Sequence, residues 1–145
     1  MLQHMLLALA TTGLFNPSDK VAPSRSEKAA LKDEVGDLSG FYTCKGQEVG
    51  GKAYSGVAVI SKKKDIYVIQ WMVTGGATFT GVAIRQGDTF SASWMLPGER
   101  GTIRGVNVYK IESGPRLTGR WATLPGPGYL QNETLTFLKA LEEEE

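Results

Sequence analysis

Residues 54–96 read YSGVAVISKKKDIYVIQWMVTGGATFTGVAIRQGDTFSASWML and decide the fold class. The stretch divides into four runs rich in β-branched and aromatic residues, each closed by a cluster of Gly, Asp or Lys residues. Such runs are typical of short strands joined by hairpin turns. We therefore predict an antiparallel meander with strands over residues 54–61, 66–73, 78–85 and 89–96.

The same pattern continues on both sides of this stretch. Further strands are predicted over residues 38–44, 103–111, 117–123 and 133–138, separated by turns rich in Gly and Pro. The connections are short, so that strands adjacent in the chain should pair antiparallel. A meander of this length must close or leave two exposed edges. We predict an all-β fold, a closed up-and-down antiparallel barrel of about eight strands, with a short N-terminal leader or helix.

A glycine recurs inside five of the predicted strands, each time two residues after a bulky apolar residue. Glycine weakens a strand and often marks a tight bend at a barrel corner or a close backbone approach. We interpret the recurrence as the curvature of a barrel; the alternative is that 18 glycines simply reflect many loops. The five are Gly40, Gly56, Gly81, Gly105 and Gly119.

The size, charge and cysteine content of the chain restrict the kind of protein that it can be. A chain of 145 residues suffices for one domain with its own core. The formal net charge is +1, and the basic residues are spread along the chain, whereas nucleic-acid binders usually show a dense basic stripe. Cys44 is the only cysteine, so no internal disulfide forms, and we predict that its side chain is a small buried hydrophobe.

Three segments are predicted: a leader and linker over residues 1–36, the barrel domain over 37–140, and an acidic tail over 141–145. The leader contains an apolar run, residues 5–10, that is too short to span a bilayer. Its length suits the core of a secretory signal, although no Lys or Arg precedes it. We predict a secreted or periplasmic protein; the alternative is a cytoplasmic protein with an N-terminal helix that packs on the domain or serves association.

The predicted barrel lacks the residues of common catalytic sites. The only histidine, His4, lies in the leader, which leaves the barrel without the usual general base and without the commonest transition-metal ligand. We predict a protein that is not an enzyme and needs no metal or cofactor. Glu133 shares a strand face with Leu135 and Phe137; we expect it at the exposed rim, because an inward Glu133 would need an arginine or a tyrosine hydroxyl as partner.

Large aromatic residues mark the odd-numbered strands. Side chains alternate across a strand, which places Tyr42, Trp71, Trp94 and Trp121 on the inward faces of the first, third, fifth and seventh strands. Each precedes its turn by a similar number of residues. We therefore expect the four to converge at one end of the barrel.

An eight-stranded barrel has an interior that side chains just fill or that holds one small ligand. The tryptophans either plug one end of a packed core or wall a pocket, with Tyr67, Tyr109 and Thr123 as its polar groups. The predicted ligand-binding residues are Tyr42, Tyr67, Trp71, Trp94, Tyr109 and Trp121. Both faces of residues 57–60 are apolar, and we expect Ala58 and Ile60 outside the barrel, where a homo-oligomer could bury them.

The body resembles the calycin barrels, the lipocalin and avidin group. The resemblance covers about residues 37–138 and is carried by the strand pattern, by LSGFY at 38–42, and by LTGRW at 117–121, which is similar to the Leu-Thr-Gly-x-Trp phrases of such barrels. It departs from that group in having Tyr42 in place of the first-strand tryptophan of lipocalins and in lacking a motif for the polar residues that hold biotin. Another bacterial family with this barrel pattern is the alternative.

Two functions follow from these patterns. The first is a noncatalytic, lipocalin- or avidin-like barrel that binds a small apolar or aromatic molecule at its tryptophan-lined end. The second is a protein-interaction module similar to an envelope inhibitor, because residues 42–46 resemble the opening strand of the periplasmic lysozyme inhibitors, whose disulfide partner is absent here. In that case, the loops over residues 47–52 and 125–129 would carry the contacts.

Overall fold

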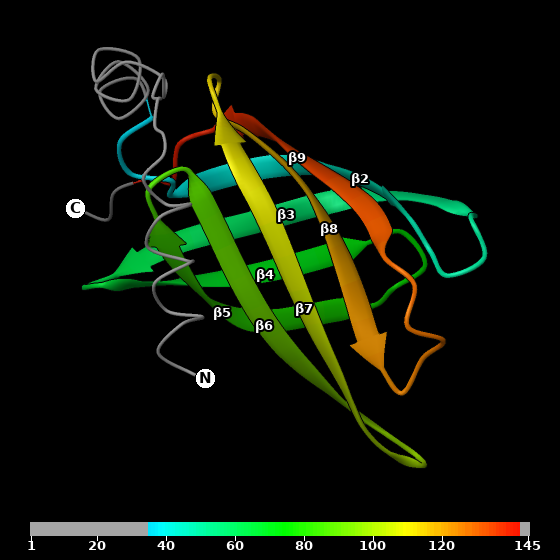
Figure 1. The fold of residues 1–145 in the computed structure, drawn as a ribbon. Coiled ribbons are helices and arrows are strands. Elements are labelled where there is room, and N and C mark those ends of the chain that lie inside the picture. The colour runs from blue at the N-terminus through cyan, green and yellow to red at the C-terminus, as the bar shows by residue number, and fades with distance from the viewer. Residues whose placement is uncertain (1–34, 143–145) are drawn as a thin grey trace, which may run out of the picture. The chain divides into compact units, whose positions relative to one another are not determined.

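The computed structural model describes residues 35–142, and these form a closed, up-and-down antiparallel β-barrel (Figure 1). Each strand pairs with its neighbours in the chain, and β9 closes the barrel on β2. The strands are β2 (Gly40–Gln47), β3 (Ala53–Lys63), β4 (Ile66–Val73), β5 (Thr78–Gln86), β6 (Thr89–Gly98), β7 (Gly101–Glu112), β8 (Arg116–Leu124) and β9 (Gln131–Lys139). The predicted fold class is confirmed.

The predicted leader, and with it the proposed signal sequence, lies outside the described residues, as does most of the acidic tail. Within residues 35–142, no helix is long and apolar enough to cross a membrane. The strand bounds agree with the prediction to within a few residues, and those of β4 agree completely. The first strand begins later than predicted, at Gly40, because residues 38 and 39 belong to the segment that covers one end of the barrel.

Residues 35–39 cover one end of the barrel. Val35 and Leu38 are buried, although residue 35 falls in the predicted linker. The Arg85 guanidinium at the end of β5 holds this segment by donating hydrogen bonds to the carbonyl oxygens of Val35, at 2.9 Å, and Gly36. This end of the barrel is hereafter the covered end; the other end is formed by the β2–β3, β4–β5, β6–β7 and β8–β9 connections.

The barrel interior is apolar near the covered end. The side chains of Ile60, Ile69, Phe90 and Leu117 are fully buried there, and Cys44 is buried as predicted. Burial of such side chains removes their surface from water and stabilises the fold by about 1.5–3 kcal/mol each.

Ala58 and Ile60 correct the expectation of a subunit contact on their strand. Both side chains are completely buried inside the barrel, because the alternation of β3 turns them inward. Apolar side chains are exposed instead on the outer face of β5, β6 and β7, at Val82, Ile84, Met95, Val106 and Val108.

The recurrent glycines allow neighbouring strands to approach closely. A Cβ atom at Gly119 would lie 2.0 Å from the carbonyl oxygen of Val108, and one at Gly81 would lie 2.4 Å from that of Ser93. At Gly105 a Cβ atom would enter the indole ring of Trp94. These glycines therefore make room for neighbouring backbone and for an aromatic ring inside the barrel, the close approach that a glycine within a strand often marks.

We expect the substitution Gly119→Ala to lower the free energy of unfolding by about 2 kcal/mol or more, because β7 and β8 must separate to admit the methyl group. Gly36→Ala is the matched control, since none of the described residues apart from its chain neighbours has an atom within 4 Å of its Cβ position; its effect should be within about 0.5 kcal/mol of zero. Urea unfolding of the two variants measures the difference. Equal stabilities would show that the close approach at Gly119 is not required.

Candidate functional site

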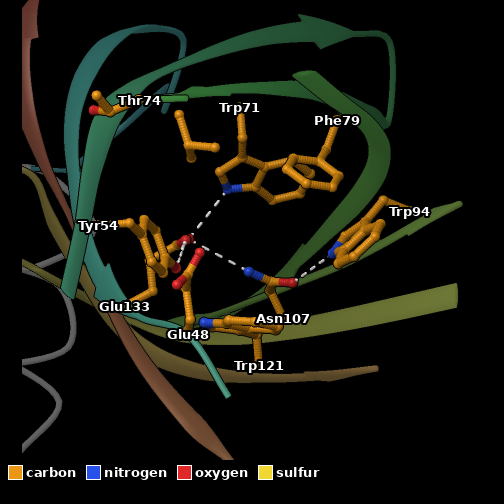
Figure 2. A pocket seen from close by; sticks show the side chains of 10 residues that line it. Glu48, Tyr54, Trp71, Thr74, Phe79, Trp94, Asn107, Trp121 and Glu133 are labelled. Carbon is orange, nitrogen blue, oxygen red and sulfur yellow. Dashed lines mark hydrogen bonds between the residues drawn. The ribbon is translucent and has the colours of Figure 1, made fainter. Parts of the chain in front are cut away.

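A cavity of about 130 Å³ opens at the end of the barrel opposite the covered end. Its lining comes from strands β3 to β9 and from the loops that follow β2 and β4. Figure 2 shows the aromatic side chains arranged around the cavity, with Glu133 beside Tyr54 and Asn107 between Glu133 and Trp94. The lining residues are Glu48, Tyr54, Trp71, Val73, Thr74, Phe79, Trp94, Asn107, Trp121 and Glu133.

The three tryptophans all line this cavity. Trp71, Trp94 and Trp121 come from β4, β6 and β8, alternate strands that run in the same direction. Two further rings complete the aromatic wall: Phe79 packs against Trp94 with ring centroids 4.8 Å apart, and Tyr54 packs edge-on against Trp121 at 6.3 Å.

Sequence reasoning did not name Tyr54 and Phe79 as site residues, although a signal for them was present. Both are the bulky residue two positions before a recurrent glycine, Gly56 and Gly81 respectively. Since residues two apart share a strand face, an inward glycine implies an inward aromatic ring.

Glu133 lies inside the barrel, which corrects the expectation of an exposed rim position. Its side chain is only 4% exposed and lines the cavity. Oε1 accepts a hydrogen bond from the Tyr54 hydroxyl at 2.6 Å. Oε2 accepts from Trp71 Nε1 at 3.1 Å, from Asn107 Nδ2 at 3.3 Å and from the Tyr109 hydroxyl. The partner anticipated for an inward Glu133, a tyrosine hydroxyl, is therefore present twice.

The network extends through Asn107 to the far wall of the cavity. Asn107 Nδ2 also donates to the Tyr109 hydroxyl at 2.9 Å, and its Oδ1 accepts from Trp94 Nε1 at 2.9 Å. Trp71 Nε1, which donates to Glu133, also donates to the Tyr109 hydroxyl at 3.2 Å. Two indole rings thus have their orientation fixed by one buried network, as the dashed lines in Figure 2 show in part.

The arrangement suits an ionised carboxylate. A carboxylate accepts only, and the Trp71 and Asn107 N–H groups that face it can only donate. Each hydrogen bond to a charged group contributes about 1.5–3 kcal/mol, so four of them are comparable with the cost of several kcal/mol for burying one ion. No ion pair to Glu133 occurs among the described residues.

The charge of Glu133 affects the groups around it. Burial, and then the negative charge of Glu133, raise the pKa of the Tyr54 and Tyr109 hydroxyls well above the ordinary value. The same two causes raise the pKa of the Cys44 thiol. These groups therefore stay protonated at neutral pH, and the two hydroxyls remain donors.

The other predicted site residues lie elsewhere. Tyr42 and Tyr67 do not line the cavity; they point toward the covered end, where the Tyr42 hydroxyl donates to the Leu38 carbonyl at 2.7 Å and the Tyr67 hydroxyl accepts from the Leu38 N–H at 3.3 Å. The predicted convergence therefore holds for the tryptophans and is wrong for Tyr42. Tyr109 lies behind the wall and contributes through Glu133, and Thr123 donates locally to the Pro125 carbonyl.

One donor of the wall is unused. The Nε1 atom of Trp121 is buried without a hydrogen-bond partner in the described part of the chain. Within that part, no three His, Cys, Asp or Glu side chains gather closely enough to hold a metal ion.

No protein-family model and no curated protein matches the chain. Among solved structures, the redesigned β-barrel b11L5F_LGL aligns with a TM-score of 0.56 and 15% identity, over 81% of this chain and 100% of that chain. The chain shares its fold with designed β-barrels.

Two further solved structures are bound to DFHBI. The redesigned β-barrel mFAP1 aligns with a TM-score of 0.52 and 19% identity, over 75% of this chain and 97% of that chain. EF1p2_mFAP2b aligns with a TM-score of 0.51 and 16% identity, over 79% and 100%. At such identities, the likeness concerns the fold alone, and the resemblance to the calycin barrels rests on the sequence phrases quoted above.

The buried hydroxyls predict alkaline sensitivity. Tyr42 and Tyr109 are almost completely buried, and burial raises the pKa of each above its ordinary value of 10.0. Because the folded pKa is the higher one, the stabilising contribution is complete below about pH 10 and is lost as the pH rises further. We expect the free energy of unfolding to fall by about 1.4 kcal/mol per pH unit for each of these groups above that point.

Urea unfolding at pH 8, 10 and 11 measures this loss. The substitution Tyr42→Phe removes one of the groups and should make the decline between pH 10 and 11 less steep. A free energy of unfolding that is the same at pH 8 and pH 11 would contradict the burial of these hydroxyls.

Proposed function

We propose that the protein is a noncatalytic barrel that binds a small molecule with an apolar or aromatic part at its tryptophan-lined end. The observation that carries the proposal is the open cavity walled by Trp71, Trp94 and Trp121. Binding sites for small molecules are typically concave and apolar, with a few fixed polar groups, and this cavity has both features.

The volume of the cavity limits the size of the ligand. An engineered cavity of about 150 Å³ binds benzene, and the cavity here is about 130 Å³. The part of the ligand that enters the barrel is therefore about the size of one ring or of a branched group of similar volume. A long acyl chain or a large fused ring system would not fit without movement of the wall.

The wall is prepared for binding before a ligand arrives. The indoles of Trp71 and Trp94 are held by Glu133 and Asn107, so little side-chain freedom remains to be lost. The solved barrels bound to DFHBI, a small aromatic dye, support the proposal in a general way, because they show that a designed barrel of this fold can bind a molecule of that class.

The proposal predicts that benzyl alcohol binds and changes the tryptophan fluorescence. The substitution Trp94→Ala should weaken this binding about tenfold or more, because it removes one aromatic face of the wall. Met95→Ala is the matched control: the neighbouring side chain is 61% exposed on the outer face of β6.

A fluorescence titration of the three proteins, with circular dichroism to verify folding, measures the effect. A Met95→Ala variant that loses as much affinity as Trp94→Ala would place the ligand outside the barrel. Absence of any response in the wild-type chain to benzyl alcohol, indole and cyclohexanol would contradict the proposal.

A further inference from the structure

We propose that the ligand of this cavity is a compact organic cation, an alkylammonium or arylmethylammonium group. The inference rests on the proposed function and specifies its ligand class. Its first support is the charge of the lining: two carboxylates, Glu48 and Glu133, face the cavity, and none of the described lining residues is Lys or Arg. Because the whole chain has a formal net charge of +1, this negative charge is a local property of the site.

The second support is the aromatic wall. Five rings line the cavity, from Tyr54, Trp71, Phe79, Trp94 and Trp121. The face of an aromatic ring is negative, and cations are attracted to it, most strongly by tryptophan. A cage of such rings around a carboxylate is a favourable environment for a weakly hydrated cation, whereas the negative ring faces repel an anion.

The third support is the coordination of Glu133. Each carboxylate oxygen can accept about two hydrogen bonds. Among the described residues, Oε2 accepts three hydrogen bonds from N–H and O–H groups and Oε1 accepts one, from Tyr54, while the Cys44 thiol is a further, weaker donor beside this carboxylate. Because Glu133 lines the cavity and Oε1 has only one strong donor, the carboxylate can also accept from a ligand N–H or be approached closely by a methylated ammonium group.

A neutral ligand would bury this carboxylate further from water without providing an opposite charge, and an anionic ligand would be repelled by it. A cation offsets the charge as it excludes water. The size limit of the cavity restricts the cationic head to about the volume of a trimethylammonium group.

The test compares probes that differ only in charge. Choline and its uncharged isostere 3,3-dimethylbutan-1-ol have the same shape, and calorimetric titration of the wild-type chain measures both affinities. We expect choline to bind about tenfold tighter or more. An isostere that binds as tightly as choline would overturn the inference; this comparison needs no variant.

The substitution Glu133→Gln identifies the group responsible. Its amide oxygen can face Trp71 and Asn107, and its NH2 group can face Tyr54, whose hydroxyl is able to accept. We expect the ratio of the choline affinity to the isostere affinity, both measured on the same variant, to fall about tenfold. The control Glu112→Gln removes the same charge from the end of β7 near the covered end, and should leave the preference unchanged. A preference that survives Glu133→Gln would overturn the role of this carboxylate.

Benzyl alcohol separates failure of the inference from failure of the proposed function. If benzyl alcohol binds and choline shows no advantage over its isostere, only the inference falls; if choline, benzyl alcohol, indole and cyclohexanol all fail to bind, the proposed function falls as well. Phosphatidylcholine vesicles carry the same ammonium group on a lipid. We expect no cosedimentation with them, since the cation is expected to be free; cosedimentation would overturn that part of the inference.

Discussion

The buried carboxylate of Glu133 is the constraint on which the open half of the barrel depends. Its two oxygens accept from donors on β3, β4 and β7, so a single side chain of β9 connects four strands across the interior. Loss of any donor would leave the others around a partly satisfied buried charge, which is costly in a medium of low dielectric constant. The network therefore fixes the positions of the rings that surround it, and a cavity with a defined wall results.

The two ends of the barrel differ in packing: the covered end is filled by side chains, and the other end contains the cavity. At the covered end, residues 35–39 lie across the opening, and the interior is filled by aliphatic and aromatic side chains, which supply stability. At the other end, the rings stand apart because the network holds them at the wall and because Gly105 on β7 leaves space for the indole of Trp94 on β6. A barrel in which both ends were packed would be more stable and would have no site.

The sequence was sufficient for the barrel and for the inward tryptophans, since both follow from the alternation of side chains and from regular turn signals. It was insufficient for Glu133 and Asn107. A single polar residue in a strand is usually exposed, and its partners here lie up to 79 positions away in the chain, as for Tyr54. The inward face of Glu133 was nevertheless visible from Leu135, and the inward face of Asn107 from Tyr109.

Tyr42 shows a second limit of prediction from side-chain alternation. It is in register with Ala58 of β3, and Ala58 is in register with Trp71, so alternation correctly turned Tyr42 inward. Alternation does not state toward which end an inward side chain leans, and strands in a barrel are tilted against its axis, so that residues in register differ in height. The tyrosine hydroxyl reached the Leu38 carbonyl at the covered end, which no local pattern encodes.

The most direct test of a ligand site inside the barrel is an NMR titration of the indole N–H signals, because all three tryptophans of the chain line the cavity. On addition of choline or benzyl alcohol, the three signals should shift together with one dissociation constant, while the backbone amides of Tyr67 and Phe90 in the packed half stay in place. Indole signals that remain unchanged, or shifts confined to the packed half or the outer face, would contradict a ligand site inside the barrel.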